Sequence, residues 1–267
     1  DGGYRVNGVK TWATFAGRAD LLMLLARTDP DRGAGHRGLS LFVVEKEPAA
    51  GHAFTFRQDS GGKMEGRAID TLGYRGMHSY EVAFEDWLVP AENLVGGDAG
   101  LGRGFYLQME GFENGRLQTA ARAVGLMQAA FEAGLDYARE RRVFGRAVVD
   151  YQLSRAKLVR MAALIQAGRQ FAYAVARRMG AGEGTLAASM VKAYVCRAAE
   201  WVTREAMQLH GGMGYAEEFP VSRYFVDARV LSIFEGADET LCVRVIAPRL
   251  AEAALRGDPA GTVQVPS

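Results

Sequence analysis

Residues 191–209 read VKAYVCRAAEWVTREAMQL, a stretch in which apolar side chains return every three or four positions. Val191, Val195, Ala198 and Val202 follow this spacing, and charged residues stand between them. Because an α-helix turns once every 3.6 residues, the spacing gathers the apolar side chains on one face. The stretch therefore predicts a long helix that packs against neighbouring helices.

A second stretch with the same period precedes the first. Its apolar residues are Leu158, Met161, Ile165, Ala172, Val175 and Met179. Glycines follow both stretches, at Gly180, Gly182, Gly211 and Gly212, and glycine is typical of helix ends. From about residue 103 onward the sequence thus predicts three long helices and a short fourth, arranged as an antiparallel bundle.

The first 98 residues have a different pattern, in which short apolar segments are separated by turns rich in Gly, Asp and Pro. Four of these segments predict strands, at residues 21–26, 39–45, 53–57 and 81–89. Pro90 is expected to end the last strand, since proline cannot donate a hydrogen bond to a sheet. We therefore predict an α+β fold, with a small β-barrel or sandwich at residues 1–98 followed by a four-helix bundle at residues 99–267.

The chain opens with the residues DGGYRVNGVKTW and without an initiating methionine. Asn7 and Gly8 lie between two strand-like pieces and predict a hairpin, because both residues tolerate a positive φ. A hairpin at the very start leads us to expect that the sequence is part of a longer chain.

Composition argues against several classes of protein. Hydrophobic residues make up 49% of the chain and charged residues 24%, which is usual for a folded domain. The 32 Lys and Arg residues nearly balance the 31 Asp and Glu residues, so no basic surface for nucleic acid is expected. No apolar run reaches the roughly 18 residues of a membrane span. With two cysteines, Cys196 and Cys242, and four scattered histidines, we expect no metal site, no disulfide framework and a cytoplasmic location.

Four motifs, taken in their order along the chain, resemble the acyl-CoA dehydrogenase family. They are KTWAT at residues 10–14, RRVFGR at 141–146, QLHGGMGY at 208–215 and IFEGADE at 233–239. The resemblance implies the family's middle β-domain and C-terminal four-helix bundle, without its N-terminal helical domain. It also implies FAD as cofactor, an acyl-CoA thioester as substrate, electron-transfer flavoprotein as partner, and a homo-oligomer that is either a dimer or a tetramer.

The resemblance assigns cofactor contacts to eight residues. Trp12 would lie against the flavin ring and Thr14 would hydrogen-bond its edge; read alone, Trp12 is more often an aromatic residue packed on its sheet. Arg141 would bind the flavin pyrophosphate, although its basic surroundings are also typical of a solvated helix end. Glu239 matches a polar position on the adenosine side. Contacts with the flavin of a neighbouring subunit are implied for Arg141, Phe144, Gln152, Gln208 and Gly212.

Glu235 is the residue to which the resemblance assigns the chemistry. Read alone, it could be a surface or capping glutamate, because glutamate is seldom buried without a partner. It follows an apolar run and precedes Gly236, a context that suits a carboxylate in a dry cleft. A base there would remove the proton next to the thioester carbonyl while hydride leaves the β-carbon. Some family members place the base at the position of Gly115, where glycine cannot serve.

Three further residues are expected to contact the substrate. The resemblance puts Glu113 near the CoA tail and Phe234 beside the substrate. It puts Arg116 behind the thioester, where its charge would hold the catalytic carboxylate. Asp238 and Glu239 are expected to affect binding on the adenosine side more than the chemistry.

Within the family, residues 58–66, 73–81 and 111–116 are most similar to the (2S)-methylsuccinyl-CoA dehydrogenases of bacterial ethylmalonyl-CoA metabolism. That resemblance implies oxidation of a Cα–Cβ single bond to a trans double bond, which yields mesaconyl-CoA. A short- or branched-chain acyl-CoA dehydrogenase is the alternative within the same class. An acyl-CoA oxidase and a non-catalytic module that binds acyl-CoA also stay open, because access of oxygen to a reduced flavin depends on how tightly the cleft closes.

Overall fold

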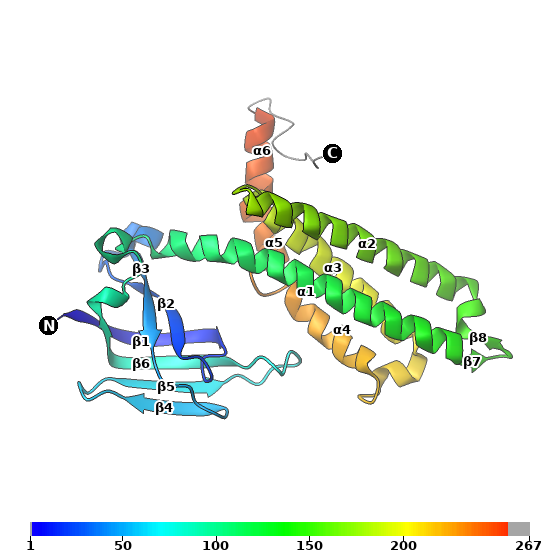
Figure 1. The fold of residues 1–267 in the computed structure, drawn as a ribbon, viewed down its shortest axis with the longest axis horizontal. Helices are drawn as coiled ribbons and strands as arrows, with labels where there is room; N and C mark the ends of the chain where they lie inside the picture. Colours follow the sequence, from blue (N-terminus) through cyan, green and yellow to red (C-terminus); the bar gives the residue numbers. More distant parts are fainter. Residues whose placement is uncertain (1, 256–267) are drawn as a thin grey trace. The chain divides into compact units, whose positions relative to one another are not determined.

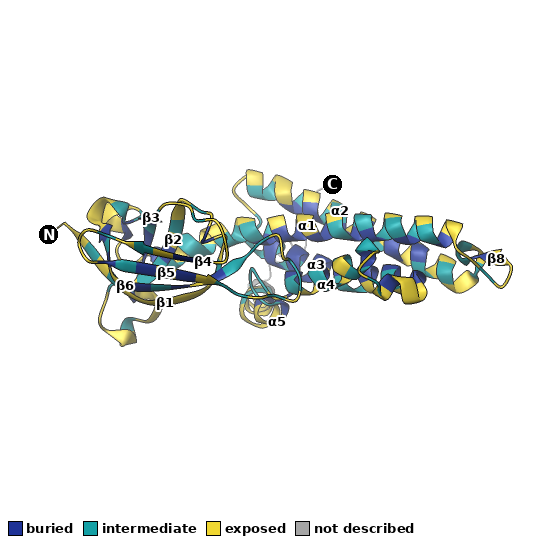
Figure 2. Cartoon of the chain, turned by 90° about the horizontal axis from the view of Figure 1, so that it is seen from below, coloured by how far each residue is buried: buried dark blue, intermediate teal, exposed yellow. Residues whose placement is uncertain are grey.

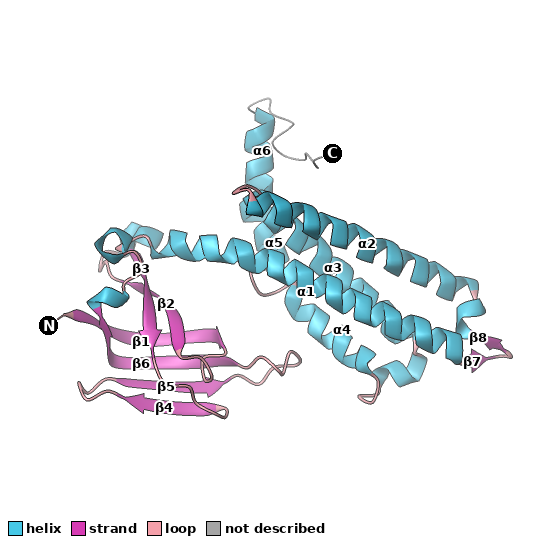
Figure 3. Cartoon of the chain, in the orientation of Figure 1, coloured by secondary structure: helices cyan, strands magenta, loops and turns pink. Residues whose placement is uncertain are grey.

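Figure 1 shows the computed structural model of the chain, which describes residues 2–255. The chain divides into two compact units, Asp1–Gly111 and Phe112–Ser267. The first unit holds the strands β1 to β6, and the second holds most of the helices, as the colours of Figure 3 show. Helix α1 (Gly104–Glu140) begins in the first unit and continues through the second. The α+β fold predicted from the sequence is therefore confirmed.

Two antiparallel sheets form most of the first unit. One has four strands in the order β1-β6-β5-β4, and the other pairs β2 with β3. The strands are β1 (Gly3–Thr14), β2 (Leu21–Arg27), β3 (Leu39–Glu45), β4 (Ala53–Arg57), β5 (Lys63–Ala68) and β6 (Ser79–Pro90). Three predicted strands match β2, β3 and β4 to within one residue, and the fourth lies inside β6, which ends at Pro90 as expected.

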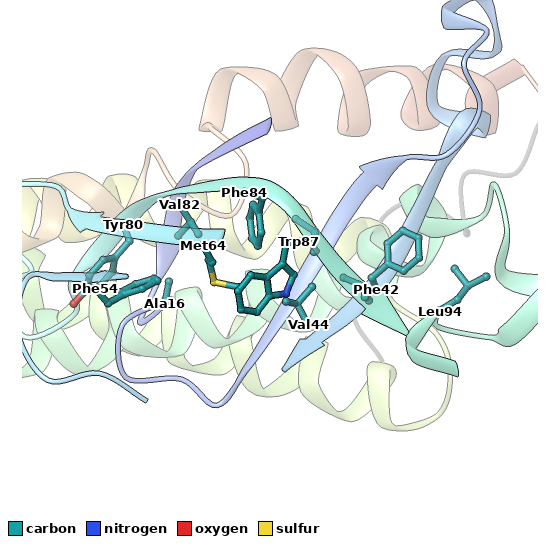
Figure 4. Close-up of a cluster of buried hydrophobic side chains, with 12 residues drawn as sticks. Ala16, Phe42, Val44, Phe54, Met64, Tyr80, Val82, Phe84, Trp87 and Leu94 are labelled. Carbon is teal, nitrogen blue, oxygen red and sulfur yellow. The ribbon is translucent and has the colours of Figure 1, made fainter. Parts of the chain in front are cut away.

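The two sheets share one apolar core. Trp87, Phe84 and Met64 belong to the four-stranded sheet, and Val44 and Phe42 come from β3. Figure 4 shows the Trp87 ring among Met64, Phe84 and Val44, and all of these side chains are buried. Burial of aromatic and aliphatic side chains is the main source of stability for such a pair of sheets.

A β-bulge in β6 replaces the hairpin that the Asn-Gly pair predicts. Two steps along β1 from Val6 correspond to three steps along β6 from Trp87, so β6 carries one extra residue. Asp86 lies in this bulge with a φ of 47°, and its backbone N–H donates to Asn7 Oδ1 at 2.9 Å. The hairpin prediction is wrong because Asn7 bonds to a residue 79 positions away, a partner that the local sequence does not reveal.

A second bulge, on β1, contains Trp12. Lys10 pairs with Val82 and Ala13 pairs with Tyr80, so three steps along β1 correspond to two along β6. Trp12 takes a φ of 59° in this bulge. A bulge changes the direction in which a side chain points, so the irregular pairing sets where the Trp12 ring lies.

The sequence pattern does not predict strand β5, because this strand contains only one large apolar residue, Met64. Its buried face is completed by β4, where Phe54 pairs with Gly66. A Cβ added at Gly66 would lie 2.1 Å from the Phe54 ring, so that ring occupies the space of the missing side chain. The strand is recognisable only when its partner is in place.

Four helices form the body of the second unit, as predicted. They are α1, α2 (Gln152–Gly180), α3 (Thr185–Leu209) and α4 (Pro220–Leu231), followed by α5 (Asp238–Thr240), a π-helical turn (Leu241–Ile246) and α6 (Ala247–Leu255). Two short strands, β7 (Arg142–Val143) and β8 (Arg146–Ala147), connect α1 to α2.

Helix α3 is central to this bundle. It packs against both α2 and α4, and Gly134 of α1 lies beside Ala206 of α3. The apolar stripe predicted for α3 is buried from Val191 to Leu209, and Figure 2 shows buried residues on the facing sides of the helices. Across the described part of the chain, no helix has the length together with the apolar character needed to cross a membrane.

Candidate active site

Glu235 lies in a tight turn that follows α4. Its φ is 54°, a left-handed backbone conformation that is rare for a residue with a long side chain, and Gly236 continues the turn at a φ of 95°. Glu235 Oε2 is buried and has no hydrogen-bond partner among the described residues. Strained residues and buried polar atoms without partners gather at functional sites, so this carboxylate is the primary catalytic candidate.

Helix α1 provides the space into which this carboxylate points. A Cβ added at Gly115 would lie 2.6 Å from Glu235 Oε2, which is closer than two such atoms can approach. Because Gly115 has no side chain, the carboxylate of Glu235 can occupy the space beside it. The structure thus brings Glu235 together with Gly115, the position where the resemblance places the base of some family members.

Arg116, the next residue of α1, is buried. Its Nη1 donates to Ser189 Oγ at 3.3 Å, and its Nε has no partner among the described residues. Burial lowers the pKa of the Arg116 guanidinium, while the charges of Glu113 and Glu235 act in the opposite direction. The guanidinium therefore lies within electrostatic reach of both carboxylates.

The other two predicted substrate residues lie near this group. Glu113 accepts a hydrogen bond from Thr185 Oγ1 at 2.8 Å, which ties α1 to the start of α3. Phe234 precedes the catalytic candidate, and the Arg122 guanidinium carbon lies 6.0 Å from the centre of its ring. Glu113, Arg116 and Glu235 thus form one charged cluster that joins α1 to the turn after α4, and α3 bonds to it at Thr185 and Ser189.

Gly115→Ala separates catalysis from stability in a single substitution. We expect the new methyl group to displace the Glu235 carboxylate and to lower kcat at least about tenfold, since a base must lie within hydrogen-bond reach of its proton. The free energy of unfolding is expected to stay constant or to rise by up to about 1 kcal/mol, because alanine has a higher helix propensity than glycine. Stopped-flow kinetics and thermal unfolding of the same sample measure the two effects.

Gly125→Ala is the matched control, because it makes the same change in the same helix. A Cβ at Gly125 would meet no atom within 4 Å. We expect Gly125→Ala to keep the wild-type kcat. Equal kcat values for both variants would contradict the placement of the Glu235 carboxylate against α1.

A second group of predicted residues lies at the opposite end of α1. Gly115 and Glu140 are 25 residues apart along the helix, which corresponds to about 38 Å at 1.5 Å per residue. Arg141 follows Glu140 directly and is exposed. Phe144, in the turn between β7 and β8, is 98% exposed at a φ of 49°. Gln152 begins α2 and is exposed as well.

The end of α3 belongs to the same group. His210 stacks on Tyr137 of α1, with ring centres 4.2 Å apart, and the Arg141 backbone N–H donates to the Tyr137 carbonyl at 2.8 Å. Burial lowers the pKa of His210, and the stacked ring anchors the loop that follows it. Gln208 and Gly212 flank this anchor and are exposed.

Trp12 and Thr14 belong to the first unit, at the bulged end of β1. Trp12 is 63% exposed and Thr14 is exposed, although a tryptophan of a sheet is usually packed. Phe15 repeats the positive φ of Trp12, at 59°, and its backbone N–H donates to the His78 carbonyl at 2.8 Å. An exposed aromatic ring on a strained backbone makes this segment a candidate for ligand contact.

The predicted contacts on the adenosine side separate in the structure. Glu239 is exposed and its Oε1 pairs with Arg197 Nη2 at 3.3 Å. Asp238, which the sequence analysis grouped with it, is instead buried and pairs with Lys192 Nζ at 3.0 Å. Asp238 therefore belongs to the support of the Glu235 turn. A solvated ligand-binding role does not fit a carboxylate buried in this way.

Sequence reasoning missed Lys192, which is fully buried in α3. A signal for it does exist. Ser189, Lys192, Cys196 and Glu200 are spaced three or four residues apart, so they form a second stripe beside the apolar one. A polar stripe next to a buried apolar stripe indicates that two faces of the helix are covered.

Comparisons with known proteins show the family of the chain. The family description "Acyl-CoA dehydrogenase, middle domain" matches residues 1–87, and "Acyl-CoA dehydrogenase, C-terminal domain" matches residues 102–251. The chain is 44% identical to (2S)-methylsuccinyl-CoA dehydrogenase of Cereibacter sphaeroides over 246 residues, which are 92% of this chain and 43% of that protein.

Two solved structures show the same fold. Butyryl-CoA dehydrogenase from Megasphaera elsdenii superposes with a TM-score of 0.82 at 32% identity, over 93% of this chain and 61% of that one. A chain from the structure of the electron transferring flavoprotein of Acidaminococcus fermentans gives a TM-score of 0.80 at 31% identity, over 95% and 61%. The chain spans about half the length of the relatives it matches. It belongs to the acyl-CoA dehydrogenase family.

Proposed function

We propose that this chain forms part of a FAD-dependent acyl-CoA dehydrogenase in which Glu235 is the catalytic base. The observation that supports this most strongly is the buried Glu235 Oε2, which has no partner among the described residues and lies against the open side of Gly115. FAD, when bound, accepts the hydride that leaves the β-carbon of the substrate.

Glu235 takes up the proton from the α-carbon. The electron pair of that C–H bond then forms the Cα–Cβ double bond as hydride leaves the β-carbon, so a saturated thioester becomes an unsaturated one. The positive charge of Arg116, which lies next to Gly115 in α1, stabilises the carboxylate before it is protonated. Exclusion of water by the surrounding buried residues strengthens this interaction.

The residues present fit a flavin nucleotide. Trp12 offers an exposed indole face and Thr14 a hydroxyl group that can donate or accept. Arg141 offers an exposed guanidinium for a pyrophosphate, and a Cβ at Gly212 would meet no atom within 4 Å, so a ligand can approach the backbone there. Phe144, Gln152 and Gln208 are exposed at the same end of the bundle, and Glu239 is proposed to contact the adenosine side.

The two ends of α1 give a reason to expect a homo-oligomer. The group around Arg141 lies about 38 Å along the helix from Gly115, which is longer than a flavin site can span together with its catalytic base. We infer that Arg141, Phe144, Gln152, Gln208 and Gly212 serve the flavin of a neighbouring subunit. Each site then needs two copies of the chain, as in a dimer or a dimer of dimers.

We propose (2S)-methylsuccinyl-CoA as the substrate and mesaconyl-CoA as the product, on the strength of the 44% identity to the dehydrogenase of that name. Electron-transfer flavoprotein is the proposed acceptor, which the structural match to a chain from an electron transferring flavoprotein structure supports.

A panel of thioesters tests this proposal in the complete FAD-loaded protein. Under anaerobic conditions, methylsuccinyl-CoA is expected to bleach the flavin at least about tenfold faster than butyryl-CoA or isobutyryl-CoA. Both of these lack the second carboxylate, so the polar groups of a site that binds it would have no partner. Equal rates would contradict the dicarboxylate assignment. Release of hydrogen peroxide in air would identify an oxidase, and colourless protein that still binds thioesters would identify a binding module.

A further inference from the structure

A buried lysine on α3 holds the turn that carries Glu235. Building on the proposed function, we propose that Lys192 is a positioning residue, which fixes the Glu235 carboxylate by anchoring the backbone carbonyl of Gly236. None of the motifs that identify the family assigns a role to this lysine.

The side chain of Lys192 forms hydrogen bonds with the turn that carries Glu235. Its side chain is fully buried, and its Nζ donates to the Gly236 carbonyl oxygen at 2.7 Å and to Asp238 Oδ1 at 3.0 Å. The second oxygen of Asp238 pairs with Arg197 Nε at 3.3 Å. Lys192 and Arg197 of α3 thus bind the turn on the C-terminal side of Glu235.

The backbone of Glu235 explains why the turn needs an anchor. A left-handed φ of 54° is unfavourable for glutamate and persists only where the surroundings enforce it. Lys192 bonds the carbonyl of the very next residue, so it fixes the peptide unit between Gly236 and Ala237 and thereby limits how far the backbone at Glu235 can rotate. Loss of that bond lets the strained residue relax toward an ordinary conformation, which moves its carboxylate.

One face of α3 supports both sides of the cluster. Ser189 accepts the hydrogen bond from Arg116 of α1, and Glu200 accepts one from Ser232 at the start of the turn. Between them, burial raises the pKa of the Cys196 thiol to about 12, so this neighbour carries no charge that could replace Asp238 as the partner of Lys192. The turn and Arg116 are therefore placed by the same rigid helix.

The test compares two variants of the complete FAD-loaded protein. Lys192→Met/Asp238→Asn removes the anchor together with the charge of its partner, because a buried carboxylate left alone would destabilise the fold. Asp238→Asn is the control, since it removes the ion pair but leaves the bond from Lys192 to the Gly236 carbonyl; the buried ammonium that it leaves without a carboxylate is expected to lower the unfolding temperature. Both are measured with methylsuccinyl-CoA and with butyryl-CoA, and all rates are expressed per bound FAD.

We expect the double variant to reduce its flavin at least about tenfold more slowly, with KM within about threefold of wild type, because a misplaced base affects the transition state and not thioester binding. Asp238→Asn is expected to stay within about threefold of the wild-type rate. Amide hydrogen exchange of residues 232–241 gives a readout apart from activity, and we expect faster exchange in the double variant alone.

Two results would overturn the role of Lys192. One is a double variant that keeps the wild-type rate per FAD and merely unfolds at a lower temperature, which is the signature of a structural lysine. The other is an equal loss of rate in Asp238→Asn, which would assign the effect to the ion pair. Failure of the proposed function is distinguishable, because Glu235→Gln would then keep the wild-type rate while exchange still quickens in the double variant.

Discussion

Glu235→Gln in the complete FAD-loaded protein is expected to slow flavin reduction by an acyl-CoA thioester at least about 10²-fold. The amide has nearly the same shape as the carboxylate, so the fold, the FAD content and thioester binding should persist. An amide does not accept a proton at neutral pH, and loss of the base acts on the transition state alone. We therefore expect kcat to fall in single-turnover and steady-state measurements while KM stays near its original value.

Two other acids provide the controls for this substitution. Glu113 accepts a hydrogen bond from Thr185 Oγ1, and Glu239 is exposed and paired with Arg197. Glu113→Gln and Glu239→Gln are expected to raise KM more than they lower kcat, because the proposed role of both residues is in binding. A wild-type rate for Glu235→Gln together with a slow Glu113→Gln would assign the base to α1.

Mixing two inactive variants is expected to restore activity. Arg141→Glu should lose FAD, because the substitution puts a carboxylate where the pyrophosphate is proposed to bind. When it is co-expressed with Glu235→Gln, a hybrid dimer combines an intact Glu235 from one chain with an intact Arg141 from the other. We expect about a quarter of the wild-type activity per chain, since half of randomly mixed dimers are hybrids and each has one complete site.

The double variant Arg141→Glu/Glu235→Gln is co-expressed with wild type at the same ratio as a control. It distinguishes sites shared between two subunits from sites within one subunit, where an inactive chain would only dilute the active one. Both defects then lie in one chain, so a hybrid has no complete site and only the wild-type homodimers are active, which leaves about a quarter of the wild-type activity per chain; sites formed within one subunit would leave about half. If the two single variants stay inactive when mixed, Arg141 and Glu235 act within one subunit, and the arrangement inferred from the length of α1 is wrong.

The parts of this fold that are visible in the sequence depend on local periodicity. The apolar stripe from Val191 to Leu209 predicts α3 because a helix repeats every 3.6 residues whatever packs against it. Strands β2, β3 and β4 are equally visible, because turns rich in Gly, Asp and Pro separate their apolar segments.

The features that are not visible depend on partners far away in the chain. The bulge at Asp86 needs Asn7, and β5 needs Phe54 to cover Gly66. Lys192 follows an apolar residue within a helical pattern, and nothing in its surroundings indicates that the Gly236 carbonyl lies beside it. Sequence motifs predict the reactive residue, whereas the groups proposed to orient it become visible only in the folded chain.

Proton exchange at the α-carbon tests the central claim, that Glu235 removes this proton, most directly. A 3-thiaacyl-CoA has sulfur at the β-position and so cannot lose hydride, while its α-proton can still exchange with solvent. With complete FAD-loaded protein in D₂O, we expect mass spectrometry to detect deuterium at the α-carbon with wild type, and at least about 10²-fold slower uptake with Glu235→Gln. Uptake at the wild-type rate in Glu235→Gln would show that another group removes the proton and would contradict this assignment of the active site.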